Sequence, residues 1–410
     1  MKVDTMRKID RWAGMPLCFL LSVWFWLWEL VFKPKQQRAQ KVLFLELSEM
    51  GSAIIADPAL RYVKAQPDAE VFFAIFKKNV SSLHLLNTIP SDNLYTFRED
   101  NLLTLVWDTL RFMVWCRRKG IDTVIDMEMF SRVSALLSRV TGAVNRVGFV
   151  AYHSEGLYRG NFLTRPVVYN AHQHIAKNFM ALSHSAMMEE EQVPFCKSLI
   201  TDDQVQLAQA RRDDTAIAAV QAILKSLYGS YEVGQRVVLI NPNASDLLPQ
   251  RRWPAEHFQA VIEDLLARYE DILVVITGAP GEFPGAQALC EAVDNPRCVN
   301  SAGKFAFRQL VPLYFVADMM LTNDSGPGHF SAVTPLRTFV IFGPETPALY
   351  SSLGNSTALY LGLACSPCVS AANHRKTDCV DNRCVKDLLP QQALAAIYPH
   401  LDRIEARAQA

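Results

Sequence analysis

The sequence lacks an excess of charge of either sign, because 41 lysines and arginines balance 41 aspartates and glutamates over 410 residues. It also lacks a basic motif interleaved with aromatic residues, so nothing indicates a nucleic acid as partner. The N-terminal half contains neither GxGxxG nor GxxxxGK[ST], which excludes an ordinary dinucleotide-binding or P-loop domain there. Half of the residues are apolar, and a chain of this length is expected to form two domains with ordinary cores.

The nine cysteines do not form the kind of framework that is typical of a small secreted protein. Five are scattered, which favours a reducing compartment, so we expect the body of the protein to lie in the cytoplasm. The other four form a C-x2-C-x10-C-x4-C pattern, whose count and spacing resemble a small zinc knuckle. A disulfide pair and free thiols are the alternatives. These four cysteines are Cys365, Cys368, Cys379 and Cys384.

Residues 12–32 form a hydrophobic run with a single charge, Glu29, and with basic residues on both flanks. The run is about long enough to cross the hydrocarbon core of a bilayer, and it lacks the cleavage site of a removed signal peptide. Its four tryptophans are typical of a membrane interface. The sequence predicts a spanning anchor or a helix embedded in one leaflet; a buried helix of the soluble fold is the third alternative. Since no partner pattern is evident, we expect residues 1–35 to be dispensable for folding.

Short apolar segments alternate with helical patterns throughout the remaining chain, which predicts parallel, doubly wound α/β sheets. A polar segment of helical pattern, residues 191–235, separates two such series. The strands expected in the first series are residues 41–47, 71–76, 122–127 and 146–149. The strands expected in the second series are residues 237–240, 272–277, 319–321 and 338–342.

The segment NDSGPGH, residues 323–329, follows one of these expected strands and precedes a helical pattern. Ligands of parallel α/β sheets lie beyond the carboxyl ends of the strands, and a helix N-terminus offers N–H groups and partial positive charge to a phosphate. The segment places a carboxylate, an amide, a hydroxyl, an imidazole and bare backbone at that point. The alternative is that Asp324 and Ser325 merely cap the helix and bind no ligand. The candidate residues are Asn323, Asp324, Ser325, Gly326, Gly328 and His329.

Two further polar loops follow strands of the same expected sheet. One leads to Arg251 and Arg252, whose guanidinium groups suit bidentate contact with phosphate; a solvated basic turn is the alternative. The other ends with the carboxylate of Glu282. Three polar loops at one sheet edge predict a ligand site there.

Together these motifs resemble those of glycosyltransferase family 9, the bacterial lipopolysaccharide heptosyltransferases. The resemblance covers residues 41–390, and NDSGPGHFSA is its most specific match, supported by RVGF, RRWP and FGPETP. It implies a GT-B fold, with two Rossmann-like domains facing a cleft. It also implies inverting transfer of a sugar from a nucleotide diphosphate donor of the ADP-heptose type to lipopolysaccharide or another glycan. No cofactor and no divalent metal are expected, since cationic side chains can neutralise the leaving group.

The resemblance further implies roles and boundaries. Asp324 would hold hydroxyls of the donor sugar, the backbone of residues 325–329 its diphosphate, Arg251 a phosphate and Glu282 the ribose. The protein would work at the bacterial inner membrane on a glycolipid or glycan acceptor. The expected parts are a membrane-associating segment 1–35, an acceptor-side domain 36–190, the helical linker 191–235 and a nucleotide-sugar domain 236–410, which holds the cysteine cluster 365–384.

One departure from the family pattern concerns the general base. Ser52 stands where the family has an aspartate, and a serine hydroxyl does not accept a proton near neutral pH without a partner. Glu49 or Asp57 would have to serve instead, and we favour Glu49. The same departure motivates a second hypothesis, a catalytically silent nucleotide-sugar binder of the same fold. A nucleotide-sugar epimerase of similar shape is a third.

Overall fold

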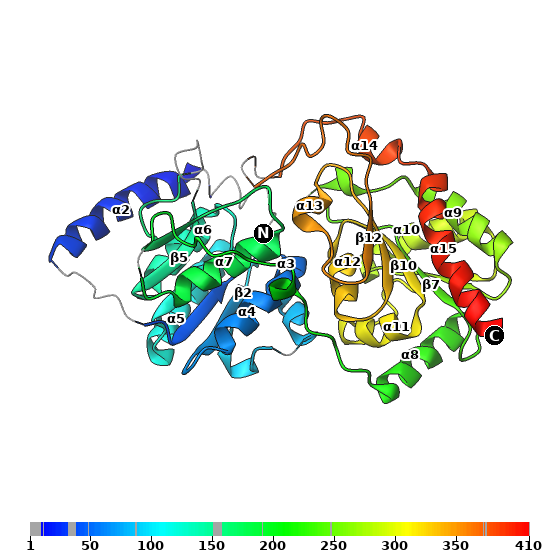
Figure 1. The fold of residues 1–410 in the computed structure, drawn as a ribbon, viewed down its shortest axis with the longest axis horizontal. Coiled ribbons are helices and arrows are strands. Elements are labelled where there is room, and N and C mark those ends of the chain that lie inside the picture. The colour runs from blue at the N-terminus through cyan, green and yellow to red at the C-terminus, as the bar shows by residue number, and fades with distance from the viewer. Residues whose placement is uncertain are drawn as a thin grey trace. The chain divides into compact units, whose positions relative to one another are not determined.

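The computed structural model shows a chain that folds into two compact units, Met1–Gln206 and Leu207–Ala410 (Figure 1). The boundary between the units falls inside the linker expected at residues 191–235. The structure describes residues 10, 12–31, 38–47, 49–86, 88–150, 158–190, 192–246, 248–371, 373 and 375–409.

The N-terminal unit contains a parallel sheet of six strands in the order β3-β2-β1-β4-β5-β6. Both faces of the central strands are buried, which explains why these strands are continuous apolar runs in the sequence. The α/β class predicted for this half is confirmed. The strands are β1 (Lys41–Leu45), β2 (Glu70–Phe76), β3 (Leu94–Phe97), β4 (Thr123–Asp126), β5 (Asn145–Val150) and β6 (Arg165–Val168).

Two helices, α5 and α6, cover one face of this sheet. Phe112 of α5 and Leu137 of α6 pack in one core cluster with Leu43, Leu45 and Phe72 of β1 and β2. The helices of this unit, besides α2, are α3 (Met50–Ile55), α4 (Asp57–Lys64), α5 (Leu102–Lys119), α6 (Arg132–Val140) and α7 (Ile175–Met187). The unit also contains three 3-10 segments: η1 (Lys77–His84), η2 (Ser91–Asn93) and η3 (Asp203–Val205).

The hydrophobic run near the N-terminus forms α2 (Gly14–Val31), which packs along α6. Cys18 of α2 is fully buried against Ala135 and Phe162. The helices approach closely where Gly14 meets Arg132, because a Cβ atom at Gly14 would lie 3.0 Å from the Arg132 Cδ atom. No partner pattern was evident in the sequence, yet α2 has a partner in the fold; that residues 1–35 are dispensable for folding stays a prediction.

Ion pairs formed by a residue before α2 and by a residue near its C-terminal end hold this segment to the domain. Asp10 contacts the buried Arg132 at 3.0 Å, and Glu29 contacts Arg139 at 3.3 Å and Arg146 at 3.5 Å. Burial, together with the charge of Arg139, lowers the pKa of Arg146 to about 10, and Glu29 opposes that shift. The partners of Glu29 lie 110 and 117 residues away in the chain, so no local pattern could have predicted them.

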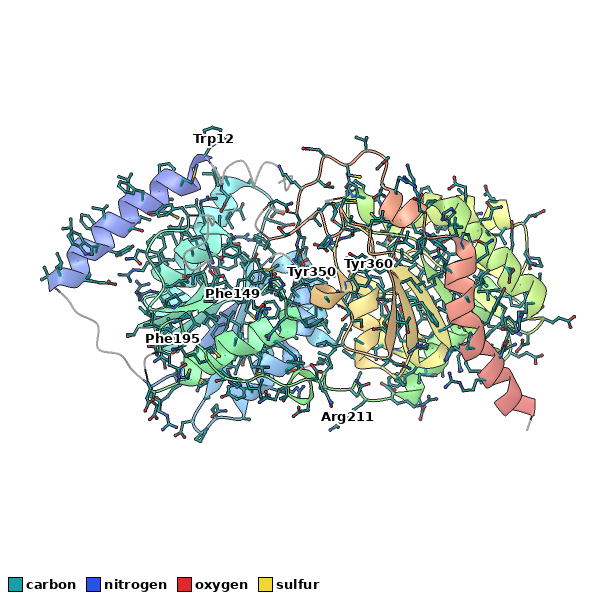
Figure 2. All side chains as sticks on the ribbon, turned by 45° about the horizontal axis from the view of Figure 1, so that its top comes forward. Trp12, Phe149, Phe195, Arg211, Tyr350 and Tyr360 are labelled. Carbon is teal, nitrogen blue, oxygen red and sulfur yellow. The ribbon has the colours of Figure 1, made fainter. Side chains whose placement is uncertain are left out.

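Most of the surface of α2 nevertheless stays exposed, including Trp12 at its N-terminal side (Figure 2). Within the described residues, α2 is the one helix long and apolar enough to cross a membrane. Residues 1–9, 11 and 32–35 of the predicted membrane segment lie outside the described part of the chain.

The C-terminal unit repeats the architecture with a six-stranded parallel sheet in the order β12-β11-β10-β7-β8-β9. In each unit the chain order reverses between two central strands, β1 and β4 in the first and β7 and β10 in the second. Ligands of open α/β sheets bind at such switch points. The strands are β7 (Val237–Asn241), β8 (Leu273–Ile276), β9 (Cys298–Asn300), β10 (Met319–Asn323), β11 (Arg337–Ile341) and β12 (Ser356–Leu359).

Three helices, α9, α10 and α15, pack in one core cluster over the second sheet. Within the predicted helical linker, only η3 and α8 are helical among the described residues, so that prediction is partly wrong. The larger helices are α8 (Asp214–Leu227), α9 (Ala255–Arg268), α10 (Phe283–Val293), α11 (Leu310–Val316) and α15 (Pro390–Gln409). Short helices and 3-10 turns are η4 (Pro249–Arg251), η5 (Pro280–Glu282), η6 (Phe307–Gln309), α12 (Gly326–Phe330), η7 (Ser331–Val333), α13 (Pro347–Tyr350) and α14 (Arg383–Lys386).

Candidate functional site

The switch point of the C-terminal unit is organised by Asn323, the last residue of β10. Its amide Nδ2 donates to the Pro242 carbonyl at 2.8 Å, and its Oδ1 accepts from the Trp253 backbone N–H at 3.0 Å. Asn323 is fully buried. It therefore ties the loop after β7 to the end of β10, and its predicted contact with the donor stays a prediction.

Arg251 lies between two acids at this edge of the sheet. Its Nη2 pairs with Oε2 of Glu345, and its Nε lies 3.4 Å from Oδ2 of Asp324. Asp324 and Glu345 are both buried. The loop after β7, the loop after β10 and the segment after β11 thus bring three charged groups together, two of which the sequence predicted as site residues.

A second arginine that sequence reasoning missed, Arg375, reaches the same cluster. Its Nε lies 3.3 Å from Oε1 of Glu345, and its guanidinium lies 5.1 Å from the ring centroid of Tyr350 in α13. The loop that carries Arg375 is held to the segment after β11, because the backbone N–H groups of Cys368 and Val369 donate to the Pro344 carbonyl at 3.0 and 3.2 Å. The one available signal for Glu345 was its place in FGPETP, a motif that begins directly after β11.

In this cluster two carboxylates pair with two guanidinium groups, and all four side chains are largely shielded from water. Such groups stabilise one another only while each charge has a partner. The two cations can also meet the oxygens of a phosphate, since guanidinium groups form strong, directional hydrogen bonds with phosphates. A carboxylate with a neighbouring cation can accept hydrogen bonds from sugar hydroxyls. The arrangement is therefore suited to a ligand that carries both phosphate and hydroxyl groups.

Arg252 lies apart from this cluster. Its side chain donates to the carbonyl of Ala244 at 2.7 Å from Nη2 and 3.1 Å from Nε, and it pairs with Asp246. Its side chain is 42% exposed, against 16% for Arg251. Of the two arginines predicted as phosphate ligands, the structure brings only Arg251 to Asp324.

The glycine-rich loop after β10 forms the single helical turn α12, which η7 continues. Ser325 makes no capping hydrogen bond, so the capping alternative does not account for its side chain; its hydroxyl donates to the Asn323 carbonyl at 3.2 Å. Gly328 is buried, and His329 is partly exposed. At Gly326 a Cβ atom would lie 2.8 Å from the Phe330 ring, which explains the need for glycine at this tight turn.

Glu282 lies at the same edge of the sheet but on the far side of β7. Its Oε2 accepts from the Ala279 backbone N–H at 2.6 Å. A Cβ atom at Gly278 would lie 3.0 Å both from this oxygen and from Asn243 Nδ2, so Glu282 lies beside the loop that follows β7. Its carboxylate stabilises its own turn, and its predicted contact with a ribose stays a prediction.

The candidate base Glu49 belongs to the N-terminal unit, where it precedes α3 just after β1. The Ser52 hydroxyl donates to Glu49 Oε2 at 3.1 Å. The segment after the neighbouring strand β4 supplies Glu128, whose Oε1 accepts from the Leu47 backbone N–H at 2.8 Å. Glu49 and Ser52 are therefore joined at the switch point between β1 and β4, where a ligand of this unit is expected.

Asp57, the alternative base, is engaged inside the domain. It is buried at the start of α4, and its two oxygens accept from Arg61 Nε at 2.8 Å and from Thr88 Oγ1 at 2.5 Å. These bonds give Asp57 a structural role. The geometry favours Glu49, as the sequence did.

The four clustered cysteines lie in the loop that carries Arg375 and in α14. Cys368, Cys379 and Cys384 place their sulfur atoms within 3.4–3.6 Å of oxygen atoms of Thr377, Asp381 and Asn382. Among the described residues, no three cysteine, histidine or acidic side chains gather closely enough to hold a metal ion. Zinc at Cys365, Cys368, Cys379 and Cys384 stays a prediction.

The two parallel α/β units define a GT-B-type glycosyltransferase fold. The chain is similar to the structure of Escherichia coli ADP-heptose lipopolysaccharide heptosyltransferase II, with a TM-score of 0.66 and 18% identity over 89% of this chain and 99% of that one. It is also similar to the glycosyltransferase family 9 structure from Veillonella parvula, with a TM-score of 0.67 and 17% identity over 90% and 99% of the two chains. At these identities the likeness concerns the fold alone.

The sequence itself assigns the family. The sequence model described as glycosyltransferase family 9 (heptosyltransferase) matches residues 110–377, more than half of the chain. The chain therefore belongs to glycosyltransferase family 9, which confirms the resemblance seen in the motifs.

Curated relatives agree with this assignment. Lipooligosaccharide heptosyltransferase 2 of Campylobacter jejuni is 31% identical over 169 residues, which are 39% of this chain and 50% of that protein. Lipopolysaccharide heptosyltransferase 1 of Escherichia coli O18:K1:H7 is 25% identical over 239 residues, 58% of this chain and 64% of that protein. The chain spans about half the length of the Campylobacter and Haemophilus relatives that it matches.

Proposed function

We propose that this protein is an inverting, heptosyltransferase-like glycosyltransferase. It transfers a sugar from a nucleotide diphosphate sugar of the ADP-heptose type to lipopolysaccharide or another glycan acceptor. The observation that carries the proposal is the placement of Arg251 between Asp324 and Glu345 at the switch point of the C-terminal sheet in a family 9 chain. The names of the similar heptosyltransferases support the choice of donor and acceptor.

In the proposed reaction an acceptor hydroxyl attacks the anomeric carbon of the donor sugar. The bond between that carbon and the diphosphate oxygen breaks, the nucleoside diphosphate leaves with the bonding electrons, and the hydroxyl proton passes to a base. Arg251 and Arg375 stabilise the negative charge that develops on the diphosphate, an effect strongest where water is excluded. Asp324 accepts hydrogen bonds from sugar hydroxyls and orients the anomeric carbon. These steps need no metal ion.

The protein is expected to work at the inner membrane of a bacterium, with both units in the cytoplasm. The exposed surface of α2 supports membrane association, and the scattered free cysteines support the reducing compartment. A glycolipid acceptor would be presented at the same membrane.

The proposal is tested by incubating the purified full chain with a panel of nucleotide sugars that includes ADP-heptose, and with a truncated lipopolysaccharide acceptor. Product formation is followed by mass spectrometry, and release of nucleoside diphosphate is measured in parallel. We expect acceptor-dependent release with one donor. Thermal stabilisation by a donor with no turnover on any acceptor would instead identify the second candidate, a silent nucleotide-sugar binder, which Ser52 in place of the family's aspartate motivates.

Replacing Arg251 by alanine is expected to raise the KM for the donor about 10- to 100-fold, because one hydrogen bond to a charged group contributes about 1.5–3 kcal/mol. Arg251→Lys should recover part of this loss, since lysine keeps the charge but not the bidentate geometry. The matched control is Arg252→Ala, which removes the neighbouring guanidinium. Steady-state kinetics with the active donor measure the effect. A change in KM for the Arg252 variant alone would contradict the assignment.

A further inference from the structure

One helix of the N-terminal unit, α5, leaves a continuous apolar stripe on the surface. Each of the exposed residues lies three or four positions from another of them, as on one face of a helix. Leu103 is 83% exposed and Trp107 is 58% exposed. The stripe consists of Leu103, Val106, Trp107, Leu110 and Val114. Single exposed apolar residues are normal on a protein surface, whereas a contiguous apolar patch marks an interaction site.

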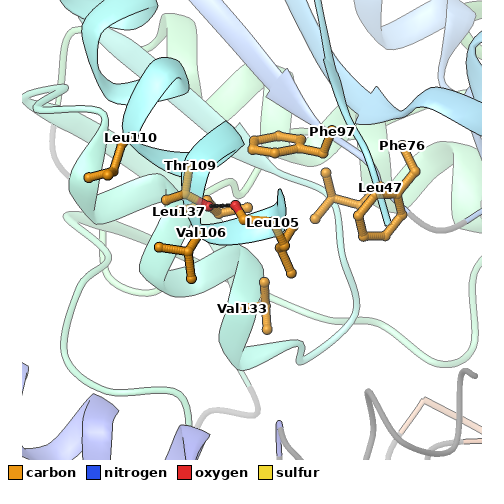
Figure 3. A pocket seen from close by; sticks show the side chains of 9 residues that line it. All are labelled: Leu47, Phe76, Phe97, Leu105, Val106, Thr109, Leu110, Val133 and Leu137. Atoms are coloured by element: carbon orange, nitrogen blue, oxygen red, sulfur yellow. Dashed lines mark hydrogen bonds between the residues drawn. The ribbon is translucent and has the colours of Figure 1, made fainter. Parts of the chain in front are cut away.

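A cavity of about 200 Å³ lies beneath this stripe, between α5 and α6 (Figure 3). Val106 and Leu110 belong both to the stripe and to the cavity wall. The one hydroxyl in the wall, that of Thr109, donates to the Leu105 carbonyl at 2.8 Å and so offers little to a polar ligand. The lining residues are Leu47, Phe76, Phe97, Leu105, Val106, Thr109, Leu110, Val133 and Leu137. A cavity with such a wall is suited to an apolar ligand.

The cavity lies near the carboxyl edge of the first sheet. Phe76 ends β2, Phe97 ends β3, and Leu47 follows β1. Leu47 is two residues from Glu49. An apolar ligand in the cavity would therefore lie close to the loop that carries the proposed base.

The wall of the cavity that faces α5 belongs to α6, which also contacts α2. Val133 and Leu137 of α6 line the cavity, whereas Ala135 of the same helix packs against Cys18 of α2. The helix α6 thus has α5 beside one part of its surface and α2 beside another. Buried contacts and ion pairs hold α2 to the domain on the side that faces α6, and most of the remaining surface of α2 is apolar and exposed.

Three arginines lie along the stripe and beyond its C-terminal end, against one exposed acid, Asp100, before its N-terminal end. Arg111 lies within the turn between Trp107 and Val114, and Arg117 and Arg118 follow at the end of α5; all three are exposed. Basic side chains beside an apolar surface are attracted to anionic lipid headgroups. This charge pattern favours a membrane surface over an apolar protein partner.

We propose that α5 is a second membrane-binding element, and that the cavity beneath it takes the end of one acyl chain of an anionic bilayer phospholipid. The stripe lies at the boundary of headgroups and acyl chains, with Arg111, Arg117 and Arg118 at the phosphates. Val106 and Leu110 form the entrance through which the chain leaves the bilayer. This inference does not depend on the proposed sugar transfer, because lipid binding is measured without donor or acceptor.

The stripe is tested by the partition of the full chain onto vesicles of phosphatidylglycerol and phosphatidylethanolamine, measured by sedimentation. Leu103→Asp and Trp107→Asp are each expected to lower the partition coefficient about tenfold. The matched control is Leu199→Asp, because Leu199 is 84% exposed in the same unit. Partition should also weaken on vesicles of phosphatidylcholine alone. The proposal would be overturned if Leu103→Asp and the control partitioned equally. It would also be overturned if the full chain formed a dimer and Leu103→Asp abolished that dimer without changing the partition.

The cavity is tested with phosphatidylglycerol that carries a photoactivatable group near the end of one acyl chain. Cross-linked peptides are expected to map to residues 102–110 and 133–137. Val133→Phe fills the cavity from α6, and it should abolish these cross-links while the melting temperature and the vesicle partition change little. Cross-links confined to α2, or cross-links that persist in Val133→Phe, would show that no acyl chain enters the cavity.

Discussion

Asp324→Asn is expected to lower the rate of sugar transfer about 100- to 1000-fold while the protein stays folded, a loss typical of removing one preorganised polar contact from a transition state. Asparagine keeps the size of the side chain but weakens the acceptor for sugar hydroxyls. Arg251 keeps Glu345 as its partner in this variant, so no buried cation is left alone. The loss should therefore appear in kcat/KM and not in the melting temperature.

The matched control is Asp246→Asn, since Asp246 is an exposed carboxylate that pairs with Arg252 in the same unit. It should transfer sugar at the wild-type rate. Initial rates with the active donor, together with thermal melting of both variants, measure the difference. Near wild-type turnover by a folded Asp324→Asn variant would show that the donor site does not lie at this edge of the sheet.

Burial determines how much of the fold could be predicted from the sequence. The eight strands that the sequence predicted are the inner strands of the two sheets, where apolar residues run without interruption because both faces are covered. The four strands it missed are the outer two of each sheet, which are short and partly exposed. An edge strand has half the pairing and less burial, so its apolar signal is weak. The missed strands are β3, β6, β9 and β12.

The residues of the candidate site also differ in whether they could be predicted from the sequence. Asp324 and Arg251 were predictable because each follows a strand in a recognisable motif. Arg375 was not, because its place beside Glu345 depends on how a later loop is held to Pro344. Asn323 was predictable as a member of the motif, but its hydrogen bond with the Trp253 backbone N–H was not, because Trp253 lies 70 residues earlier in the chain.

The second prediction in this section concerns the base. Glu49→Gln is expected to lower kcat about 100- to 10,000-fold, the usual contribution of a general base, with little change in the KM for the donor. The Ser52 hydroxyl donates to the Glu49 carboxylate at 3.1 Å, so Ser52 is a positioning residue. Ser52→Ala should lower kcat by a smaller factor, because the Glu49 carboxylate loses the hydrogen bond that orients it but can still accept a proton.

Asp57→Asn separates a catalytic role from a structural one. Asp57 accepts hydrogen bonds from Arg61 and Thr88 inside the domain, so its replacement should lower the melting temperature while the folded fraction keeps its kcat. Ser52→Asp places a carboxylate where the family pattern has one, three residues from Glu49, and two carboxylates at that distance repel each other. If Glu49 is the base, Ser52→Asp gains little. A large gain in Ser52→Asp, with no loss in Glu49→Gln, would mean that the natural protein lacks a working base and binds its nucleotide sugar without efficient transfer.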